Sequence, residues 1–252
     1  MKTILITGAS SGFGLETARY FLERDWHVVA TMRTPREDLL PASPRLRLLP
    51  LDVTDPRSIQ AAISAAGQVD VLVNNAGFGG AIPIELTSME TVRELFETNT
   101  FGTIAVTQAV LPAMRERGHG TIINVTSSVT YKPLPLVGAY RASKAAVNAI
   151  TESLAAEVEQ FGIRVHLVLP GSSAETRFRE NAGSRMRGLD DPIYGQFMQE
   201  TINRMLASVS AGTRSIDVAE AVWRAANDPA APRRIPAGAD AIEWAAQAAT
   251  AM

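Results

Sequence analysis

Apolar residues gather along this chain in short runs rich in Val, Ile and Leu, a composition typical of β-strands. The six clearest runs cover residues 3–7, 27–32, 46–51, 69–74, 121–126 and 163–169. They alternate little with polar residues, which indicates strands that are covered on both faces. Between them, apolar positions recur at steps of three and four, the period of a helix that buries one face. The predicted helices cover residues 14–24, 56–66, 88–117 and 139–161.

This repeated alternation of strand and helix predicts an α/β fold. Strands buried on both faces require helices on each side of a parallel sheet, so we expect a doubly wound, Rossmann-like sheet. A seventh short strand is predicted near 233–237, which makes about seven strands in all. No repeat, low-complexity tract or linker marks a boundary, so residues 1–252 are predicted to form a single domain.

The alternation stops between Gly171 and Gly212, where polar stretches mix with large apolar side chains. A segment that follows the sixth strand leaves the carboxyl edge of the sheet, where ligands bind in such folds. We therefore predict a substrate-binding lid over residues 171–212, with Phe178, Phe197 and Met198 in contact with the substrate. A helical excursion with a small core of its own is the alternative interpretation.

The composition of the chain argues against several classes of function. The 252 residues include 24 Lys and Arg and 26 Asp and Glu, a net charge of −2 that does not indicate a nucleic-acid or membrane-surface partner. The absence of cysteine excludes disulfides and thiolate catalysis, and the three distant histidines form no metal-ligand motif. No apolar run reaches the roughly 18 residues that span a bilayer, and a strand begins at once. We expect a cytoplasmic protein without a metal.

A glycine cluster follows the first strand. The stretch TGASSGFG contains Gly8, Gly12 and Gly14 just before the first predicted helix. Glycines let the backbone turn tightly and approach a pyrophosphate, whose charge the helix N-terminus stabilises. The spacing is Gly-x-x-x-Gly-x-Gly, and its place between a strand and a helix favours a dinucleotide site.

The residues at the end of the second strand indicate which dinucleotide the site binds. Sites that prefer NAD carry an acidic residue here, whereas this chain has Met32 followed by Arg33. A guanidinium can hold a phosphate through two parallel hydrogen bonds, so the sequence predicts NADP(H). A solvated arginine at the start of a loop is the alternative.

The stretch AYRASKA opens the last long helix and places Tyr140 one turn before Lys144. This is either an ordinary helical pair or a general acid/base in which the ammonium lowers the pKa of the phenol.

Together these motifs resemble the short-chain dehydrogenase/reductase family, in the oxidoreductase branch whose chains are about as long as this one. The resemblance covers residues 1–170 and is carried by TGASSGFG, LDVTD, NNAG, NTFGT, IINVTSS, YRASK and LPG, in that order. It implies that residues 1–252 form a dinucleotide-binding and catalytic domain of the carbonyl reductase type.

The resemblance also implies roles for particular residues. The catalytic group would be Asn99, Ser127, Tyr140 and Lys144, with Ser128 as a structural loop residue. Both the family pattern and its usual distance to the tyrosine select Ser127. The residues implied to bind the cofactor are Gly8, Ser10, Ser11, Gly12, Phe13, Gly14, Arg33, Asp52, Val53, Asn75, Ala76, Gly77, Tyr140, Lys144, Pro170 and Gly171. Ser127 and Tyr140 would also contact the substrate.

One motif departs from the family. After the sixth strand the family reads Pro-Gly-x-x-x-Thr, whereas this chain reads PGSSAET and places Thr176 one residue late. The family's contact between this loop and the nicotinamide amide is therefore not carried over to this chain.

The sequence predicts an NADPH-dependent reductase of a small-molecule ketone or aldehyde, acting as a homodimer or homotetramer by family analogy. Two other hypotheses stay open. One is an NAD-dependent alcohol or hydroxysteroid dehydrogenase, and the other is a dinucleotide-binding redox sensor without turnover.

Overall fold

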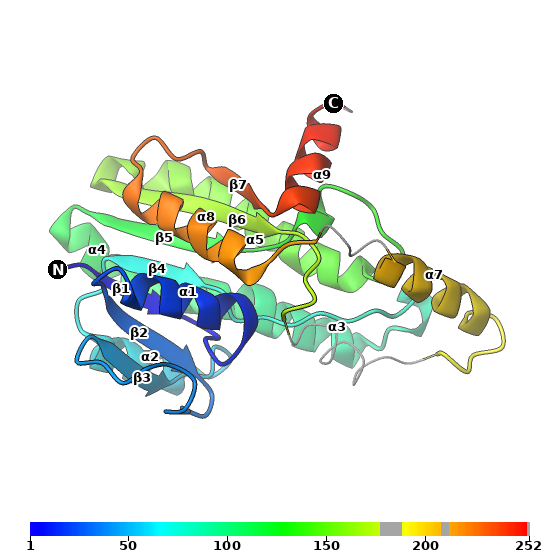
Figure 1. Cartoon of the computed structure of the whole chain (residues 1–252), viewed down its shortest axis with the longest axis horizontal. Helices are drawn as coiled ribbons and strands as arrows, with labels where there is room; N and C mark the ends of the chain where they lie inside the picture. The colour runs from blue at the N-terminus through cyan, green and yellow to red at the C-terminus, as the bar shows by residue number, and fades with distance from the viewer. Residues whose placement is uncertain (177–187, 208–211, 251–252) are drawn as a thin grey trace.

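In a computed structural model, the chain is described over residues 1–176, 188–207 and 212–250. Within these ranges seven parallel strands form one sheet with the order β3-β2-β1-β4-β5-β6-β7 (Figure 1). The strands are β1 (Thr3–Ile6), β2 (His27–Met32), β3 (Leu46–Pro50), β4 (Val71–Asn74), β5 (Gly120–Val125), β6 (Ile163–Pro170) and β7 (Arg234–Ala237). The predicted doubly wound sheet, including its seventh strand, is confirmed.

Helices cover both faces of this sheet. The α-helices of the described ranges are α1 (Gly12–Leu22), α2 (Pro56–Ala66), α3 (Met89–Phe96), α4 (Gly102–Arg117), α5 (Gly138–Val158), α7 (Gly195–Ala207), α8 (Ser215–Asn227) and α9 (Ala239–Thr250). One hydrophobic core lies between the sheet and α1 with α8, and a second lies between the sheet and α2, α4 and α5. Figure 1 shows α1 and α8 side by side on one face, while α9 projects away from the body.

Successive side chains along a strand point to opposite faces of the sheet and so belong to different cores. In β1, Ile4 and Ile6 belong to the core under α1 and α8, whereas Leu5 belongs to the core on the other face. All three side chains are fully buried, which explains why the strand shows no polar alternation.

The predicted helix over 88–117 is present, but it is not one regular element. It consists of α3, a π-helical turn at Glu97–Phe101, and α4. The wider turn carries Asn99, which is completely buried. Short π-helical turns occur frequently at functional sites, because the extra residue per turn re-aims the side chains. The buried positions of this turn are the polar residues Asn99 and Thr100, so the apolar pattern of the helix is interrupted here.

The order of the strands places a switch point between β1 and β4. The chain winds outward in opposite directions from these two central strands, so the loops at their carboxyl ends separate and leave a crevice. This is the edge of the sheet at which the glycine turn after β1 and the segment after β4 meet.

The predicted lid over 171–212 is described in part. Phe178 lies outside the described residues. Helix α7 is tied to the turn Ile84–Leu86 through Tyr194, whose hydroxyl donates to Glu85 Oε2 at 2.6 Å. Met198 is fully buried, and Phe197 is 42% exposed. A lid function for this segment stays a prediction.

Among the helices in the described ranges, none combines the length and apolar character that crossing a membrane would require.

Candidate active site

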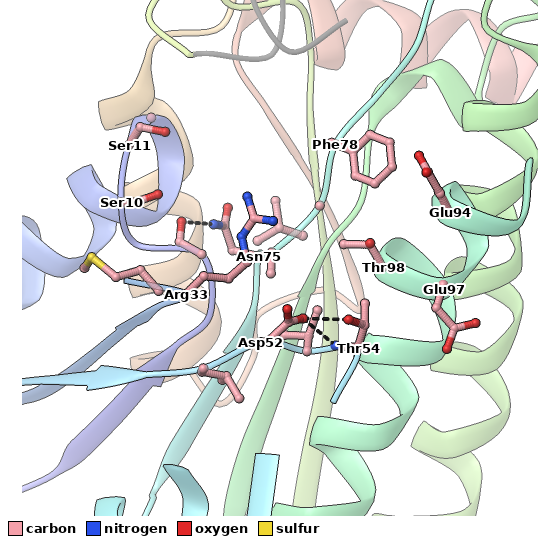
Figure 2. Close-up of a pocket in the computed structure, with 18 of the residues that line it drawn as sticks. Ser10, Ser11, Arg33, Asp52, Thr54, Asn75, Phe78, Glu94, Glu97 and Thr98 are labelled. Atoms are coloured by element: carbon pink, nitrogen blue, oxygen red, sulfur yellow. Dashed lines mark hydrogen bonds between the residues drawn. The ribbon is translucent and has the colours of Figure 1, made fainter. Parts of the chain in front are cut away.

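A cavity of about 920 Å³ opens at the carboxyl edge of the sheet. Its floor comes from the ends of the central strands, and α3 forms one wall (Figure 2). Figure 2 shows Ser10, Ser11 and Arg33 on one side of this space and Glu94, Glu97 and Thr98 on the other. Such a volume, at a topological switch point, is the expected position for a dinucleotide.

The glycine turn brings backbone directly to this cavity. Gly8 has a φ of +70°, and a Cβ atom there would lie 2.8 Å from the Cα of Ala76. Only glycine tolerates both this conformation and this close approach. The turn leads into α1, and its residues Ser10, Ser11, Gly12 and Phe13 line the cavity. The first N–H groups of α1 have no partner within the helix, so this end of α1 is suited to an anion.

The segment after β4 holds the glycine turn in place. The Asn75 side chain donates from Nδ2 to the carbonyl oxygens of Thr7 and Gly8, at 3.0 and 3.1 Å. The hydroxyl of Thr7 in turn accepts hydrogen bonds from the backbone N–H groups of Asn75 and Ala76, both at 3.0 Å. Asn75, Ala76 and Gly77 all line the cavity, as predicted for cofactor-binding residues.

One end of the cavity, beside the carboxyl ends of β2 and β3, carries the carboxylate of Asp52 and the guanidinium of Arg33. Asp52 Oδ1 accepts hydrogen bonds from the hydroxyl and the backbone N–H of Thr54, at 2.7 and 2.9 Å. These bonds, and to a smaller extent the charge of Arg33, lower the pKa of Asp52, so it is ionised at neutral pH. Arg33, Asp52 and Val53 line the cavity together.

The other end carries Tyr140 and Lys144, which α5 places one turn apart. Both side chains are buried, and both reach the cavity. Tyr140 shares a hydrogen bond with the side chain of Ser127. Lys144 Nζ donates to the carbonyl oxygen of Val125 at the end of β5, at 3.1 Å.

Asn99 joins the segment after β4 to α5. Its Oδ1 accepts from the N–H of Phe78 at 3.0 Å, and its Nδ2 donates to Phe78 O and to Ser143 Oγ at 2.9 and 3.0 Å. A Cβ atom on Gly77 would lie 2.8 Å from Asn99 Oδ1 and 3.2 Å from Lys144 Nζ. The four residues expected to be catalytic are therefore brought together, although Asn99 and Ser127 do not line the cavity.

Burial controls the protonation of this cluster in the free protein. Burial raises the pKa of Tyr140 to about 12, an effect that the hydrogen bond from Ser127 partly opposes. Burial lowers the pKa of Lys144 to about 8. The expectation that the ammonium lowers the pKa of the phenol is therefore not met in the free protein, where loss of hydration raises that pKa.

This burial predicts a pH-dependent stability difference between wild type and Lys144→Met. The pKa of Lys144 is about 8 in the folded protein against an ordinary 10.5, so between these values the unfolded chain binds more protons and the free energy of unfolding rises with pH. The advantage of Lys144→Met should be largest below pH 8 and shrink toward pH 10.5. Denaturant unfolding of both proteins at several pH values measures it, and a constant difference would contradict a buried amine.

The two adjacent serines have different surroundings. Ser127 precedes a 3₁₀ turn, Ser128–Thr130, and its Oγ accepts from the N–H of Val129 at 3.3 Å while facing Tyr140. Ser128 is 1% exposed, and its Oγ has no hydrogen-bond partner among the described residues. Of the two, Ser127 is the serine that contacts Tyr140, and its catalytic role stays a prediction.

Several residues expected at the site lie elsewhere. In the described structure Gly14 packs beneath the glycine turn, and neither Pro170, the last residue of β6, nor Gly171, which follows it, lines the cavity. Phe197 and Met198 of α7 do not line it either, so their contact with a substrate stays a prediction.

The cavity wall formed by α3 and the π-helical turn that follows it was not predicted from the sequence. The cavity residues of this wall are Glu90, Arg93, Glu94, Glu97 and Thr98. Their spacing of three and four residues is the only sequence signal, and it is indistinguishable from the solvated face of an ordinary helix. Among the described residues, no group of three or more His, Asp and Glu side chains could hold a metal ion.

Comparison with known proteins gives a consistent set of relatives. The family described as short chain dehydrogenase matches residues 2–187. A 3-ketodihydrosphingosine reductase from Bacteroides thetaiotaomicron is 41% identical over 203 residues, 79% of this chain and 74% of that protein. A crystal structure of a short-chain dehydrogenase from Streptomyces avermitilis has a TM-score of 0.84 at 32% identity, covering 99% of this chain and 92% of that chain. A short chain dehydrogenase from Burkholderia cenocepacia, in complex with NADP, has a TM-score of 0.78 at 28% identity, covering 99% and 94% of the two chains.

Proposed function

This chain belongs to the short-chain dehydrogenase family, and from that premise we propose that it reduces a ketone or aldehyde to the alcohol with NADPH. The observation that carries the proposal is the pairing of Tyr140 with Ser127 and Lys144 at one end of a cavity whose other end holds Arg33. The reaction is reversible, with Tyr140 as the general acid in reduction and the general base in oxidation.

The residues present fit a dinucleotide. The close backbone approach at Gly8 and the N-terminus of α1 suit a diphosphate, and the ionised Asp52 suits an adenine amino group. Lys144 would hold the hydroxyls of the nicotinamide ribose. When bound, the reduced nicotinamide supplies a hydride for the carbonyl carbon.

The chain's own residues supply the proton and stabilise the charge. With a pKa raised to about 12, Tyr140 is protonated at neutral pH and can donate its proton to the developing alkoxide oxygen. The Ser127 hydroxyl offers a second hydrogen bond to the same oxygen. Asn99 fixes the segment after β4 against α5, which holds Lys144 and Tyr140 at their positions.

The surroundings of Tyr140 favour a substrate with an apolar part. Tyr140 packs in a cluster with Leu95 and Val137, against which Phe78 and Leu134 also lie. The reductase relative is named for a keto substrate, which supports reduction at a ketone. We therefore expect apolar ketones and aldehydes to be better substrates than charged ones.

Arg33→Ala tests the choice between NADPH and NADH. The exposed guanidinium at the cavity would pair with a 2′-phosphate, so its loss should weaken NADPH binding by about 2 kcal/mol, roughly thirtyfold. NADH binding should barely change. Titrations that follow cofactor fluorescence measure both affinities.

Arg36→Ala is the matched control, because Arg36 lies in the same loop and pairs with Asp38 at 2.7 Å outside the cavity. It should leave both affinities unchanged. Equal weakening of NADPH and NADH by Arg33→Ala would show that Arg33 acts through the fold, and tighter binding of NADH by the wild type would favour the NAD-dependent dehydrogenase.

A further inference from the structure

The segment that follows β6 leads from the sheet to the glycine turn. Residues 171–176 leave the end of β6, and Thr176 lines the cavity. A Cβ atom on Gly12 would lie 2.9 Å from Thr176 Cγ2, so Thr176 packs directly over the phosphate-binding turn. The path of this segment therefore sets where Thr176 lies against the glycine turn.

Two side chains from distant parts of the sequence hold the start of this segment. The N–H of Gly171 donates to Thr213 Oγ1 at 2.9 Å, and the N–H of Ser172 donates to Asp240 Oδ2 at 2.7 Å. Thr213 Oγ1 also lies 2.8 Å from Asp240 Oδ1, and the N–H of Thr213 donates to the carbonyl oxygen of Ser172 at 2.8 Å. Asp240 and Thr213 thus form one hydrogen-bonded unit around Gly171 and Ser172.

Gly171 allows residues 171–172 to approach the Asp240 carboxylate closely. A Cβ atom on Gly171 would collide with both oxygens of the Asp240 carboxylate, so the approach requires glycine at this position. A carboxylate that accepts from a backbone N–H makes a charge-assisted bond, which is stronger than a neutral one. Thr213 is 2% exposed, which protects its bonds from competition with water.

The other end of the segment is also held by a hydrogen bond, through Glu175. Glu175 Oε2 accepts from the N–H of Ser215, the first residue of α8, at 2.7 Å. The six residues between β6 and the cavity are therefore bonded at both ends to the elements that follow them in sequence. Asp240 is the second residue of α9, so the C-terminal helix is itself part of this attachment.

We propose that Asp240, acting with Thr213, is a positioning residue for NADP(H): it holds residues 171–176 so that Thr176 lies against the phosphates bound at the glycine turn. The proposal rests on the proposed function. Its consequence is that cofactor affinity depends on the attachment of α9, a helix that otherwise projects from the body (Figure 1).

A purely structural role is the competing explanation, because an acid in the first turn of a helix stabilises that helix. The two roles predict different measurements. Loss of helix stability would lower the melting temperature and the amount of active protein. Loss of positioning would raise the KM and Kd for NADPH while kcat at saturating NADPH stays within about twofold.

The experiment compares NADPH binding by wild type, Asp240→Ala, Asp240→Asn and Glu243→Ala. Asp240→Ala should weaken NADPH binding about tenfold or more, the scale for losing a charged hydrogen bond that orients a site. Asp240→Asn should restore most of the affinity, because its amide oxygen can accept from Ser172 and its amide nitrogen can donate to Thr213. Glu243→Ala removes an acid one turn later on α9, where Glu243 bonds only to Gln247 among the described residues, and should bind NADPH like wild type.

Each outcome supports or overturns either the proposed function or the positioning role of Asp240. If wild type does not bind NADPH, the proposed function fails. If wild type binds and Asp240→Ala binds equally well, or if Asp240→Asn is as weak as Asp240→Ala, the positioning role is overturned. Should Asp240→Ala not fold, Thr213→Val removes the same unit from the other side, and it must then weaken NADPH binding without lowering kcat at saturation.

Discussion

Tyr140→Phe should lower kcat for ketone reduction at least about a hundredfold, which is the lower end of the range for losing a general acid. The ring keeps its packing against Leu95 and Val137, so the fold should be preserved. The only group removed is the hydroxyl that holds a proton at neutral pH and faces Ser127. Steady-state kinetics with an apolar ketone measure the loss.

NADPH affinity is the control for this variant. The glycine turn, Asp52 and Arg33 lie toward the other end of the cavity, so the Kd for NADPH should change little. Near-full turnover by Tyr140→Phe would contradict its role as the acid, whereas a joint loss of turnover and NADPH binding would indicate damage to the site rather than to proton transfer.

Ser127→Ala should lower kcat by roughly a hundredfold, as when one donor to a developing oxyanion is removed. The Ser127 hydroxyl shares a hydrogen bond with Tyr140, which places it beside the proposed acid. Loss of its bond from Val129 should cost little stability, because a single neutral bond at a turn contributes about 1 kcal/mol.

Ser128→Ala separates catalysis from local structure. Its hydroxyl is buried and has no partner among the residues that the structure describes, so removing it gives up no hydrogen bond there. Turnover should therefore stay close to wild type. A larger loss at Ser128 than at Ser127 would reverse the assignment between the two serines.

The fold was predictable because its strands lie inside the sheet. A strand such as β1 is covered on both faces, which leaves an apolar run, Ile4 to Ile6, that the sequence displays directly. The turn at Gly8 was predictable for a similar reason, since a positive φ and a close backbone approach demand glycine. The π-helical turn at Asn99 was not, because a polar stretch inside a helical pattern does not show how many residues each turn contains.

The site was predictable where its residues stand close together along the chain. Tyr140 and Lys144 are one turn apart, and the motif that contains Ser127 has its own spacing. The contacts of Asp240 and Thr213 with residues 171–172 span 68 and 42 residues, and no local pattern reveals them. The pKa of Tyr140 was predicted in the wrong direction, because burial is a property of the folded structure and not of the neighbouring residues.

The central claim is that this chain transfers a hydride from NADPH to a carbonyl carbon. The most direct measurement incubates the protein with a panel of apolar ketones and aldehydes and with NADPH that carries deuterium at the transferable position, and then analyses the products by mass spectrometry. The account predicts an alcohol that contains one deuterium on its carbinol carbon, formed by wild type and nearly abolished in Tyr140→Phe. NADPH binding without any deuterated alcohol from the panel would contradict the account and favour a dinucleotide-binding sensor.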